Sequence, residues 1–447
     1  MLERVSLRIL EKALAKLDDG FTALPEVEQS LDEQSIERVM LQVAGIMRDN
    51  YPYFHPYYAG QMLKPPHPIA RLAYMLSLWI NPNNHALDGG RASSMLEKEA
   101  VAEMARLFGW HRFLGHLTGG GTMANLEALW IAGRLKKGQK VVASEQAHYT
   151  HGRISDVLGL DFQPVGCDDR ARMDVRALRK VLDAGGVGTV VATLGTTGSG
   201  SVDPLPEIIE LREHYGFRLH ADAAYGGYFI LADNLAPDTR KALGCLNDVD
   251  SIVIDPHKHG LQPYGCGCIL YRDPAVGTFY KHDSPYTYFS SSDLHLGEIS
   301  LECSRPGASA VALWATQKLL PLVPGGEFSA GLSKARAAAL ALYGKIHSAK
   351  RFRTIFPPEL DIVVWAPSGR RASQISSRSQ NIFRAAAEKD LHLATFKYPS
   401  KLLRSRWADV DFDRDDVTCL RSCLMKPEHC DWIGNIWEII QDAAGSV

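Results

Sequence analysis

The stretch Ser251–Asp273 reads Ser-Ile-Val-Ile-Asp-Pro-His-Lys-His-Gly-Leu-Gln-Pro-Tyr-Gly-Cys-Gly-Cys-Ile-Leu-Tyr-Arg-Asp, which predicts two short apolar strands joined by a turn. Lys258 lies in that turn, just after the first strand. Ligands of open α/β sheets bind outside the carboxyl ends of the strands, so a lysine at this point is well placed to project into a cleft. The segment therefore indicates an α/β fold with a site built around Lys258.

A second strand end lies upstream, in His-Ala-Asp-Ala-Ala-Tyr-Gly-Gly, where Asp222 closes the apolar strand Arg218–Asp222. An aspartate and a lysine in this order are what a protein needs to hold pyridoxal phosphate. The aspartate keeps the pyridine nitrogen protonated, and the lysine carries the aldehyde as a Schiff base. His220 points the same way along the strand and is placed to orient Asp222. Ala224 leaves room against a ring face.

The pattern around these segments alternates strands and helices from about residue 117 to residue 272, which predicts a mainly parallel sheet with helices on both faces. Residues 1–50 show two helical patterns, and the first places Leu2, Val5, Ile9, Ala13 and Leu17 on one face. We expect three parts: an N-terminal helical and extended segment (1–90), a large α/β domain (91–323) and a small α+β domain (324–447).

Three further segments follow predicted strands or open predicted helices. Thr118–Asn125 is a glycine-rich turn before a helix, which suits an anion. His148 follows the strand Lys140–Ser144 and could lie flat on a cofactor ring. Gly195–Asp203 offers small hydroxyl groups, and its Asp203, before a proline, is interpreted as a turn residue. Each segment alone is also compatible with an ordinary loop, so their weight comes from their occurrence together.

These motifs occur in the order seen in the pyridoxal-phosphate-dependent group II amino-acid decarboxylases, of the aspartate-aminotransferase-like superfamily (fold type I). Over about residues 50–445 the chain resembles the bacterial and archaeal tyrosine/aspartate decarboxylase branch most. The resemblance implies that Lys258 is the Schiff-base lysine, that Asp222 pairs with the pyridine nitrogen, and that Ala224 packs beneath the ring on which His148 stacks. It also implies phosphate-binding and ring-contacting residues, which are Gly120, Gly121, Thr122, His257 and Thr196.

Two positions depart from the family pattern. Gly119 stands where relatives often carry serine, which removes one hydroxyl contact to the phosphate. Met123 replaces a common acidic residue, and we expect it to point into the helix. The family's proton donor is a tyrosine on a mobile loop similar to Lys281–Leu296 here, so Tyr286 is the first candidate and Tyr288 the second.

Two other reactions stay open on the sequence. Arg421, on a predicted small-domain strand, could hold a substrate α-carboxylate as aminotransferases do. The lysine turn also resembles that of sphingosine-phosphate lyases, which are carbon–carbon lyases. A non-catalytic relative of the fold is disfavoured by the retention of both Asp222 and Lys258, because a buried charge without a function is costly.

The substrate side chain is not readable. We expect it to meet the aromatic segment Tyr51–Tyr58, represented by Tyr57, and the polar turn with Asn83 and His85, from the same subunit or across a subunit boundary. The aromatic residues suit an aromatic amino acid, whereas His85 suits an acidic one. The resemblance implies a homodimer with shared active sites.

Composition narrows the remaining possibilities. A charged content of 22% and a net charge of −2 give no basic excess that would point to nucleic acid or an anionic membrane. No apolar run approaches the ~20 residues of a membrane span, and the charged N-terminus does not resemble a secretory signal. The eight scattered cysteines lack metal-site spacing and are expected to be reduced thiols of a cytoplasmic protein.

Overall fold

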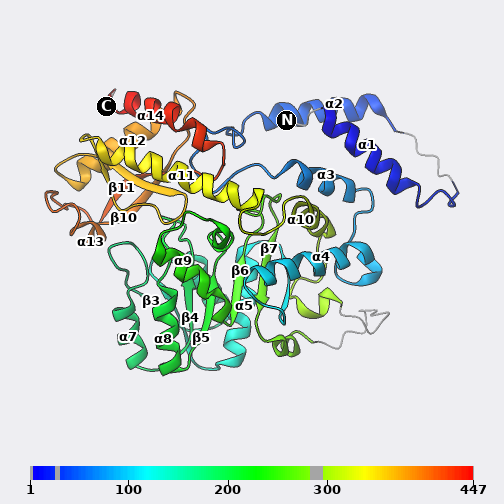
Figure 1. Cartoon of the computed structure of the whole chain (residues 1–447), viewed down its shortest axis with the longest axis horizontal. Coiled ribbons are helices and arrows are strands. Elements are labelled where there is room, and N and C mark those ends of the chain that lie inside the picture. The colour runs from blue at the N-terminus through cyan, green and yellow to red at the C-terminus, as the bar shows by residue number, and fades with distance from the viewer. Residues whose placement is uncertain (1–3, 26–30, 282–294, 446–447) are drawn as a thin grey trace.

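The computed structural model describes residues 4–25, 31–281 and 295–445, and its centre is a sheet of seven strands in the order β1-β7-β6-β5-β4-β2-β3 (Figure 1). The neighbours from β6 to β3 are parallel, and β7 runs antiparallel to both β6 and β1. The strands are β1 (Leu114–Thr118), β2 (Lys140–Ser144), β3 (Phe162–Val165), β4 (Val187–Thr193), β5 (Arg218–Asp222), β6 (Ser251–Ile254) and β7 (Gly267–Tyr271).

Both faces of this sheet are covered, which explains why its strands are apolar without alternation. On β6, Ile252 and Ile254 join the core on one face, whereas Val253 joins the core on the other. The first face packs against α4 (Leu87–Leu107), α7 (Val175–Asp183) and α8 (Leu205–Tyr215), and α9 (Pro237–Gly244) contributes to the same core. The opposite face packs against α5 (Gly121–Leu135) and α6 (Thr150–Val157).

A second, antiparallel sheet has the order β10-β11-β9-β8. Its strands are β8 (Phe352–Thr354), β9 (Ile362–Pro367), β10 (Ala394–Pro399) and β11 (Asp416–Cys423). Alternate residues of β9 face different cores: Ile362 and Val364 pack toward the large sheet, and Val363 and Trp365 pack under the helices. Those helices are α11 (Glu327–Ser348), α12 (Ala372–Ala387) and α14 (His429–Gly445). A short α13 (Ser400–Leu403) follows β10.

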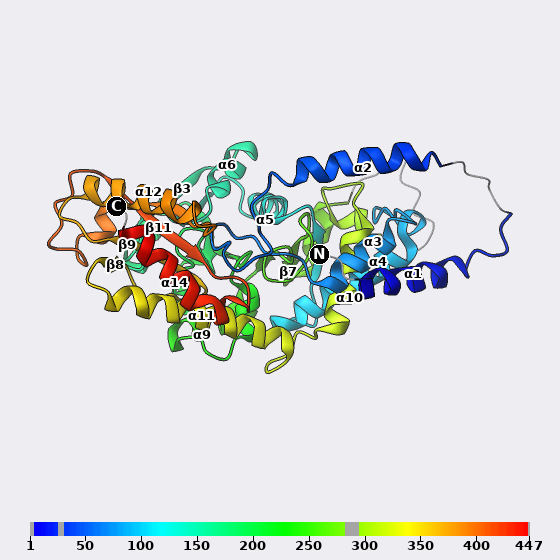
Figure 2. The ribbon, with the colours of Figure 1, turned by 90° about the horizontal axis from the view of Figure 1, so that it is seen from above.

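The N-terminal helices α1 (Arg4–Asp18) and α2 (Glu33–Met47) extend away from both sheets at the end opposite the small sheet (Figure 2). No residue of α2 is buried in this chain. On α1, the predicted apolar face includes Val5 and Ile9, each 49% exposed, while Leu10 is the buried residue. Helix α3 (Pro68–Ser77) then returns to the body and packs with α4 against α10 (Gly307–Leu319).

The predicted fold class is confirmed. The strands at Lys140–Ser144 and Arg218–Asp222 have the predicted bounds. Asp174 caps the start of α7, where its carboxylate accepts from the N–H groups of Arg176 and Ala177. Strands β1, β3, β8 and β10 are not among the predicted elements, and β3 and β10 lack a continuous apolar run. The three-part division of the chain remains a prediction. Within the described ranges, no helix is both long and apolar enough to cross a membrane.

The interpretation of Asp203 as a turn residue was wrong. Its side chain is fully buried and accepts hydrogen bonds from the N–H groups of Met173, at 2.7 Å, and Thr193, at 2.8 Å. The carboxylate therefore joins the end of β4 to the segment that leads into α7. Burial raises the pKa of Asp203 to about 7, against the opposing effect of those two hydrogen bonds.

Candidate active site

A cavity of about 570 Å³ opens at the carboxyl ends of the parallel strands, and most of the predicted site residues line it. These are Gly120, Gly121, Thr122, His148, Asp222, Ala224, His257 and Lys258. They come from four segments that are far apart in the sequence: the start of α5, the loop after β2, the end of β5 and the turn after β6. The parallel sheet brings these segments together because their strands end at the same edge.

Lys258 projects into the cavity from the turn that follows β6, and its side chain is 20% exposed. Its ammonium lies 3.1 Å from Oδ2 of Asp255, the residue that directly follows β6. Asp255 is buried, and its Oδ1 has no hydrogen-bond partner among the described residues. The sequence reasoning overlooked Asp255, although an acidic residue three positions before a strand-end lysine can reach that lysine across one turn.

Asp222 is held at the end of β5 by His151, whose Nε2–H donates to Oδ2 at 2.9 Å. The amide of Asn125 also donates to Oδ2, at 3.3 Å, and the N–H of Ala224 donates to Oδ1. Burial alone would raise the pKa of Asp222. The hydrogen bond and charge of His151, with the charge of Lys258, instead lower it well below the usual range. Asp222 is therefore an anion at neutral pH.

The prediction that His220 orients Asp222 needs correction, because no direct hydrogen bond joins the two described side chains. His220 donates from Nε2 to Oδ1 of Asn125, at 2.9 Å, and accepts at Nδ1 from the Ser251 hydroxyl. It therefore acts through Asn125, and the direct partner is His151. Burial lowers the pKa of His220 to about 3, so this imidazole is neutral.

The glycine-rich turn places the start of α5 against the lysine turn. Gly120 has φ = 148°, which favours glycine, and a Cβ at Gly121 would lie 2.6 Å from Oδ2 of Asp255. Helix α5 is 15 residues long, and no side chain caps its start, so the N–H groups of its first turn are suited to bind an anion in the cavity. Met123 also lines the cavity, so the expectation that it points into the helix was wrong.

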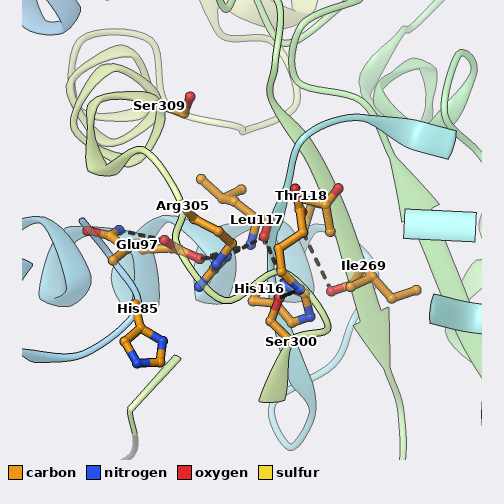
Figure 3. A network of polar contacts seen from close by, with 12 residues as sticks. His85, Glu97, His116, Leu117, Thr118, Ile269, Ser300, Arg305 and Ser309 are labelled. Carbon is orange, nitrogen blue, oxygen red and sulfur yellow. Dashed lines mark hydrogen bonds and ion pairs between the residues drawn. The ribbon is translucent and has the colours of Figure 1, made fainter. Parts of the chain in front are cut away.

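Gly119 is contacted by Glu302, a residue from outside the glycine-rich turn. Its N–H donates to Oε2 of Glu302 at 2.9 Å, and a Cβ at this position would lie 3.0 Å from Oε1. A serine side chain would therefore displace the Glu302 carboxylate. Behind the turn, Glu97 accepts from the N–H of Leu117 and from Arg305, both at 2.9 Å, and this buried ion pair anchors β1 to the segment before α10 (Figure 3).

The two histidines of the cavity are held through one ring nitrogen each. Nδ1 of His148 lies 2.8 Å from the Thr150 hydroxyl, and burial lowers the pKa of His148. His257 donates from Nδ1 to the carbonyl oxygen of Cys266 at 2.7 Å, which leaves Nε2 toward Asp255 at 3.6 Å. Burial also lowers the pKa of His257. Both rings are therefore oriented and neutral near neutral pH.

Thr196 does not line the cavity. Its hydroxyl turns into its own loop, where it lies 3.0 Å from the Ser199 hydroxyl and accepts from the N–H of Ser201. Its neighbours Thr193 and Thr197 line the cavity instead. The hydroxyl of Thr193 is buried without a hydrogen-bond partner in the described part of the chain. The sequence of this segment does not reveal which of the three threonine hydroxyls faces the cavity.

The predicted substrate residues lie outside the cavity of their own chain. Tyr57 packs edge-on against Trp432, with ring centroids 5.2 Å apart. Asn83 donates to the Ser304 hydroxyl and accepts from the N–H of Arg305, and His85 lies 3.4 Å from the sulfur of Cys303. Tyr286 and Tyr288 lie outside the described residues.

The guanidinium of Arg421 is hydrogen-bonded to other groups of the protein. It is buried on β11 and donates to the carbonyl oxygen of Thr197 at 2.9 Å and to the side-chain oxygen of Gln61 at 2.6 Å. Its side chain does not line the cavity. The arrangement ties the small sheet to the loop after β4 and leaves only Nε without a hydrogen bond to a described residue.

An amine, an anionic carboxylate, two flat neutral imidazoles and a helix start around one cavity define a site for a phosphorylated cofactor that a lysine holds covalently. Comparison with known families identifies the class. The model described as "Pyridoxal-dependent decarboxylase conserved domain" matches residues 11–366, and the chain belongs to this family. It is a pyridoxal-phosphate-dependent amino-acid decarboxylase.

Curated relatives agree with this assignment. A protein of Methanothermobacter thermautotrophicus named "Probable L-tyrosine/L-aspartate decarboxylase" is 29% identical over 332 residues, which cover 72% of this chain and 86% of the relative. The "L-aspartate decarboxylase" of Thermococcus kodakarensis is 31% identical, over 64% of this chain and 73% of the relative. The "L-tyrosine decarboxylase" of Levilactobacillus brevis is 27% identical, over 57% of this chain and 56% of the relative.

Solved structures share the fold at low identity. Mouse CSAD superposes with a TM-score of 0.78 at 18% identity, over 98% of this chain and 99% of that one. Oryza sativa TDC, solved with PLP and tryptamine, gives a TM-score of 0.79 at 17% identity, over 96% of this chain and 91% of that one.

The residues present fit pyridoxal phosphate. The cavity offers an amine at Lys258, a carboxylate kept anionic by His151, and hydroxyls such as that of Thr193 with unused hydrogen-bonding capacity. Gly120 and Gly121 leave the start of α5 without side-chain obstruction. The cavity therefore matches pyridoxal phosphate both in its chemical groups and in the space that it leaves for the phosphate.

Proposed function

We propose that this decarboxylase converts an aromatic or acidic L-amino acid to its amine and CO₂, with Lys258, Asp222 and His148 as the central residues. The observation that carries the proposal is the convergence of the Lys258 amine and the anionic Asp222 carboxylate on one cavity. When bound, pyridoxal phosphate supplies an electron sink for the bond that breaks.

Each residue then has a proposed task at a stated atom. Lys258 would hold the cofactor through Nζ, and Asp222, whose carboxylate His151 keeps ionised, would pair with the pyridine nitrogen. His148 and Ala224 would contact the ring. The N–H groups of Gly120, Gly121 and Thr122 would hold the phosphate. His257 can donate to the phosphate from Nε2 only as an imidazolium, a form that a phosphate dianion favours.

The position of Arg421 favours decarboxylation over transamination. A firm arginine–carboxylate pair stabilises the ground state, whose charge disappears as CO₂ forms, and so it opposes decarboxylation. Two of the three guanidinium nitrogens of Arg421 already donate to Thr197 and Gln61. Arg421 is therefore less suited to hold a substrate α-carboxylate, which is the role that would support an aminotransferase.

The substrate class rests on the relatives. Proteins named for L-tyrosine and for L-aspartate match this chain at similar identity, so both substrates are candidates. The test is to incubate the purified enzyme with a panel of L-amino acids and measure CO₂ and amine. Amine with equal CO₂ from tyrosine or aspartate is expected. A keto acid without CO₂, or an aldehyde from carbon–carbon cleavage, would contradict the proposal. Tyr286→Phe would test the proposed proton donor in the same assay.

We further propose that the enzyme is a homodimer of the cytoplasm whose active sites are shared. Helix α2 supports this because its apolar side chains are exposed: Val39, Met40, Leu41, Val43, Ile46 and Met47. A role of Tyr57, Asn83 and His85 toward substrate requires the cavity of the second subunit. The eight free cysteines suit a reducing compartment. Light scattering on Ile46→Glu should report monomer where the unaltered chain reports dimer.

A further inference from the structure

A second cavity, of about 410 Å³, lies between the segment before α3, helix α11 and the loop that leads into α14. None of its lining residues lines the active-site cavity. Its wall includes His259, the neighbour of Lys258 in the sequence, so the two cavities lie on either side of the lysine turn. The proposed function assigns no task to this second cavity.

Four basic side chains line this cavity. Lys64, Arg71, Lys334 and Lys426 line it, and the carboxylates among its lining residues, Glu327 and Glu428, are exposed at its rim. Lys426 is only 3% exposed; its ammonium donates to the carbonyl oxygen of Tyr58 at 2.7 Å. Within the described ranges, no ion pair shorter than 4 Å is formed by Lys64, Arg71 or Lys426.

The nearest buried carboxylate does not neutralise these cations by contact. Asp361 is fully buried and accepts the Tyr225 hydroxyl at 2.5 Å through Oδ1, while its Oδ2 lies 3.2 Å from His259. On the wall itself, Nε of Arg71 is buried without a hydrogen-bond partner among the residues that the structure describes. Unpaired cations in such a place are costly, and a bound anion removes that cost.

Two lysines of this cavity have lowered pKa values, and burial is the main cause for both. Burial and, to a smaller extent, the charge of Lys64 lower the pKa of Lys426 to about 7, against the opposing charge of Glu428. Burial also lowers the pKa of Lys64, to about 8, against the opposing charges of Asp361 and Glu428. An anion placed between them would raise both pKa values.

The rest of the wall is apolar, with Pro65, Pro66, Leu261, Phe328 and Leu332. A cavity of this kind suits a ligand with an apolar body and a few charged groups. We propose that the second cavity is a ligand site for a small organic carboxylate, held by Lys64, Arg71 and Lys426 and packed against these apolar side chains.

The test is isothermal titration calorimetry of the pyridoxal-phosphate-loaded enzyme with succinate, and separately with inorganic phosphate. Saturable binding of succinate is expected. Lys64→Met should weaken it by about thirtyfold or more, because it removes a half-buried positive charge from the contact. Lys64 donates no hydrogen bond to a described residue, so its loss should leave the fold intact. Lys137→Met is the matched control at an exposed lysine, and it should bind as the unaltered enzyme does.

A second measurement does not depend on a variant. Carbon-13 NMR of the reductively methylated enzyme should show two lysines that titrate near pH 7 and pH 8 and move to higher pH with succinate. The absence of saturable succinate binding, or binding unchanged in Lys64→Met, would overturn the proposal. So would tight binding of phosphate without succinate, since that would describe an inorganic-anion site.

Discussion

Asp222 and Asp203 are both buried carboxylates, and both lie at the carboxyl-end edge of neighbouring strands, β5 and β4. Asp222 accepts a hydrogen bond from His151 and lies in the field of Lys258, so its pKa is lowered. Asp203 accepts only backbone N–H groups and lies in the field of Asp168 and Glu359, so burial raises its pKa to about 7. Burial is common to both, and the neighbouring charges decide the protonation state.

The two aspartates therefore differ in their proposed tasks: Asp222 serves the chemistry of the site, and Asp203 serves the structure. An aspartate that must stay anionic inside the protein needs a cation or a strong donor beside it, and Asp222 has both. Asp203 needs neither, because its task is to join two backbone segments.

Substitution of Asp222 should have the largest effect. Asp222→Asn keeps the shape but removes the charge that faces the cofactor, so kcat/KM should fall by about 10³-fold, roughly 4 kcal/mol. Steady-state amine production at saturating pyridoxal phosphate measures this loss, and the thermal unfolding curve checks that the fold is intact. Activity within tenfold of the unaltered enzyme would remove Asp222 from the proposed site.

Substitution of Asp203 should alter stability and its dependence on pH. The pKa of Asp203 in the folded chain, about 7, is above the ordinary value of 3.8. Its favourable contribution to folding is therefore complete below about pH 4 and is lost as the pH rises toward 7, a change of a few kcal/mol. Asp203→Asn should flatten the free energy of unfolding over this range, as measured by urea denaturation.

Asp238→Asn, at an exposed position on α9, is the matched control for the pH experiment and should keep the slope of the unaltered chain. An unchanged slope in Asp203→Asn would mean that its two backbone hydrogen bonds outweigh burial and keep the carboxylate ionised.

The sequence predicted the part of the site that depends on strand ends. Asp222 ends one apolar run and Lys258 lies in the turn after another, and a parallel sheet brings such strand ends to one edge, so their convergence could be predicted from the strand pattern. Asp203 could not be interpreted in this way, because its partners are the backbone N–H groups of Met173 and Thr193, which carry no sequence signal.

Side-chain direction inside loops and helices was the other limit. Thr196 was expected to face the cofactor, but its hydroxyl is hydrogen-bonded within its own loop, and Thr193 and Thr197 line the cavity instead. His220 was expected to contact Asp222 because alternate residues of a strand share a face. Asn125, from the facing helix α5, stands between them. Contacts contributed by a second element are not visible in the pattern of the first.

His151 supplies the smallest of the three effects and the sharpest test of the comparison. It lies three residues after His148 at the start of α6, and without it Asp222 would be a buried acid much like Asp203. His151→Leu should raise the pKa of Asp222, so kcat/KM should fall about tenfold at neutral pH and more steeply as the pH is lowered. His151→Gln, which can still donate to Asp222, should recover most of the loss. If the two variants give the same pH profile, the charge of Lys258 alone keeps Asp222 ionised, and the difference between the two carboxylates rests on the lysine.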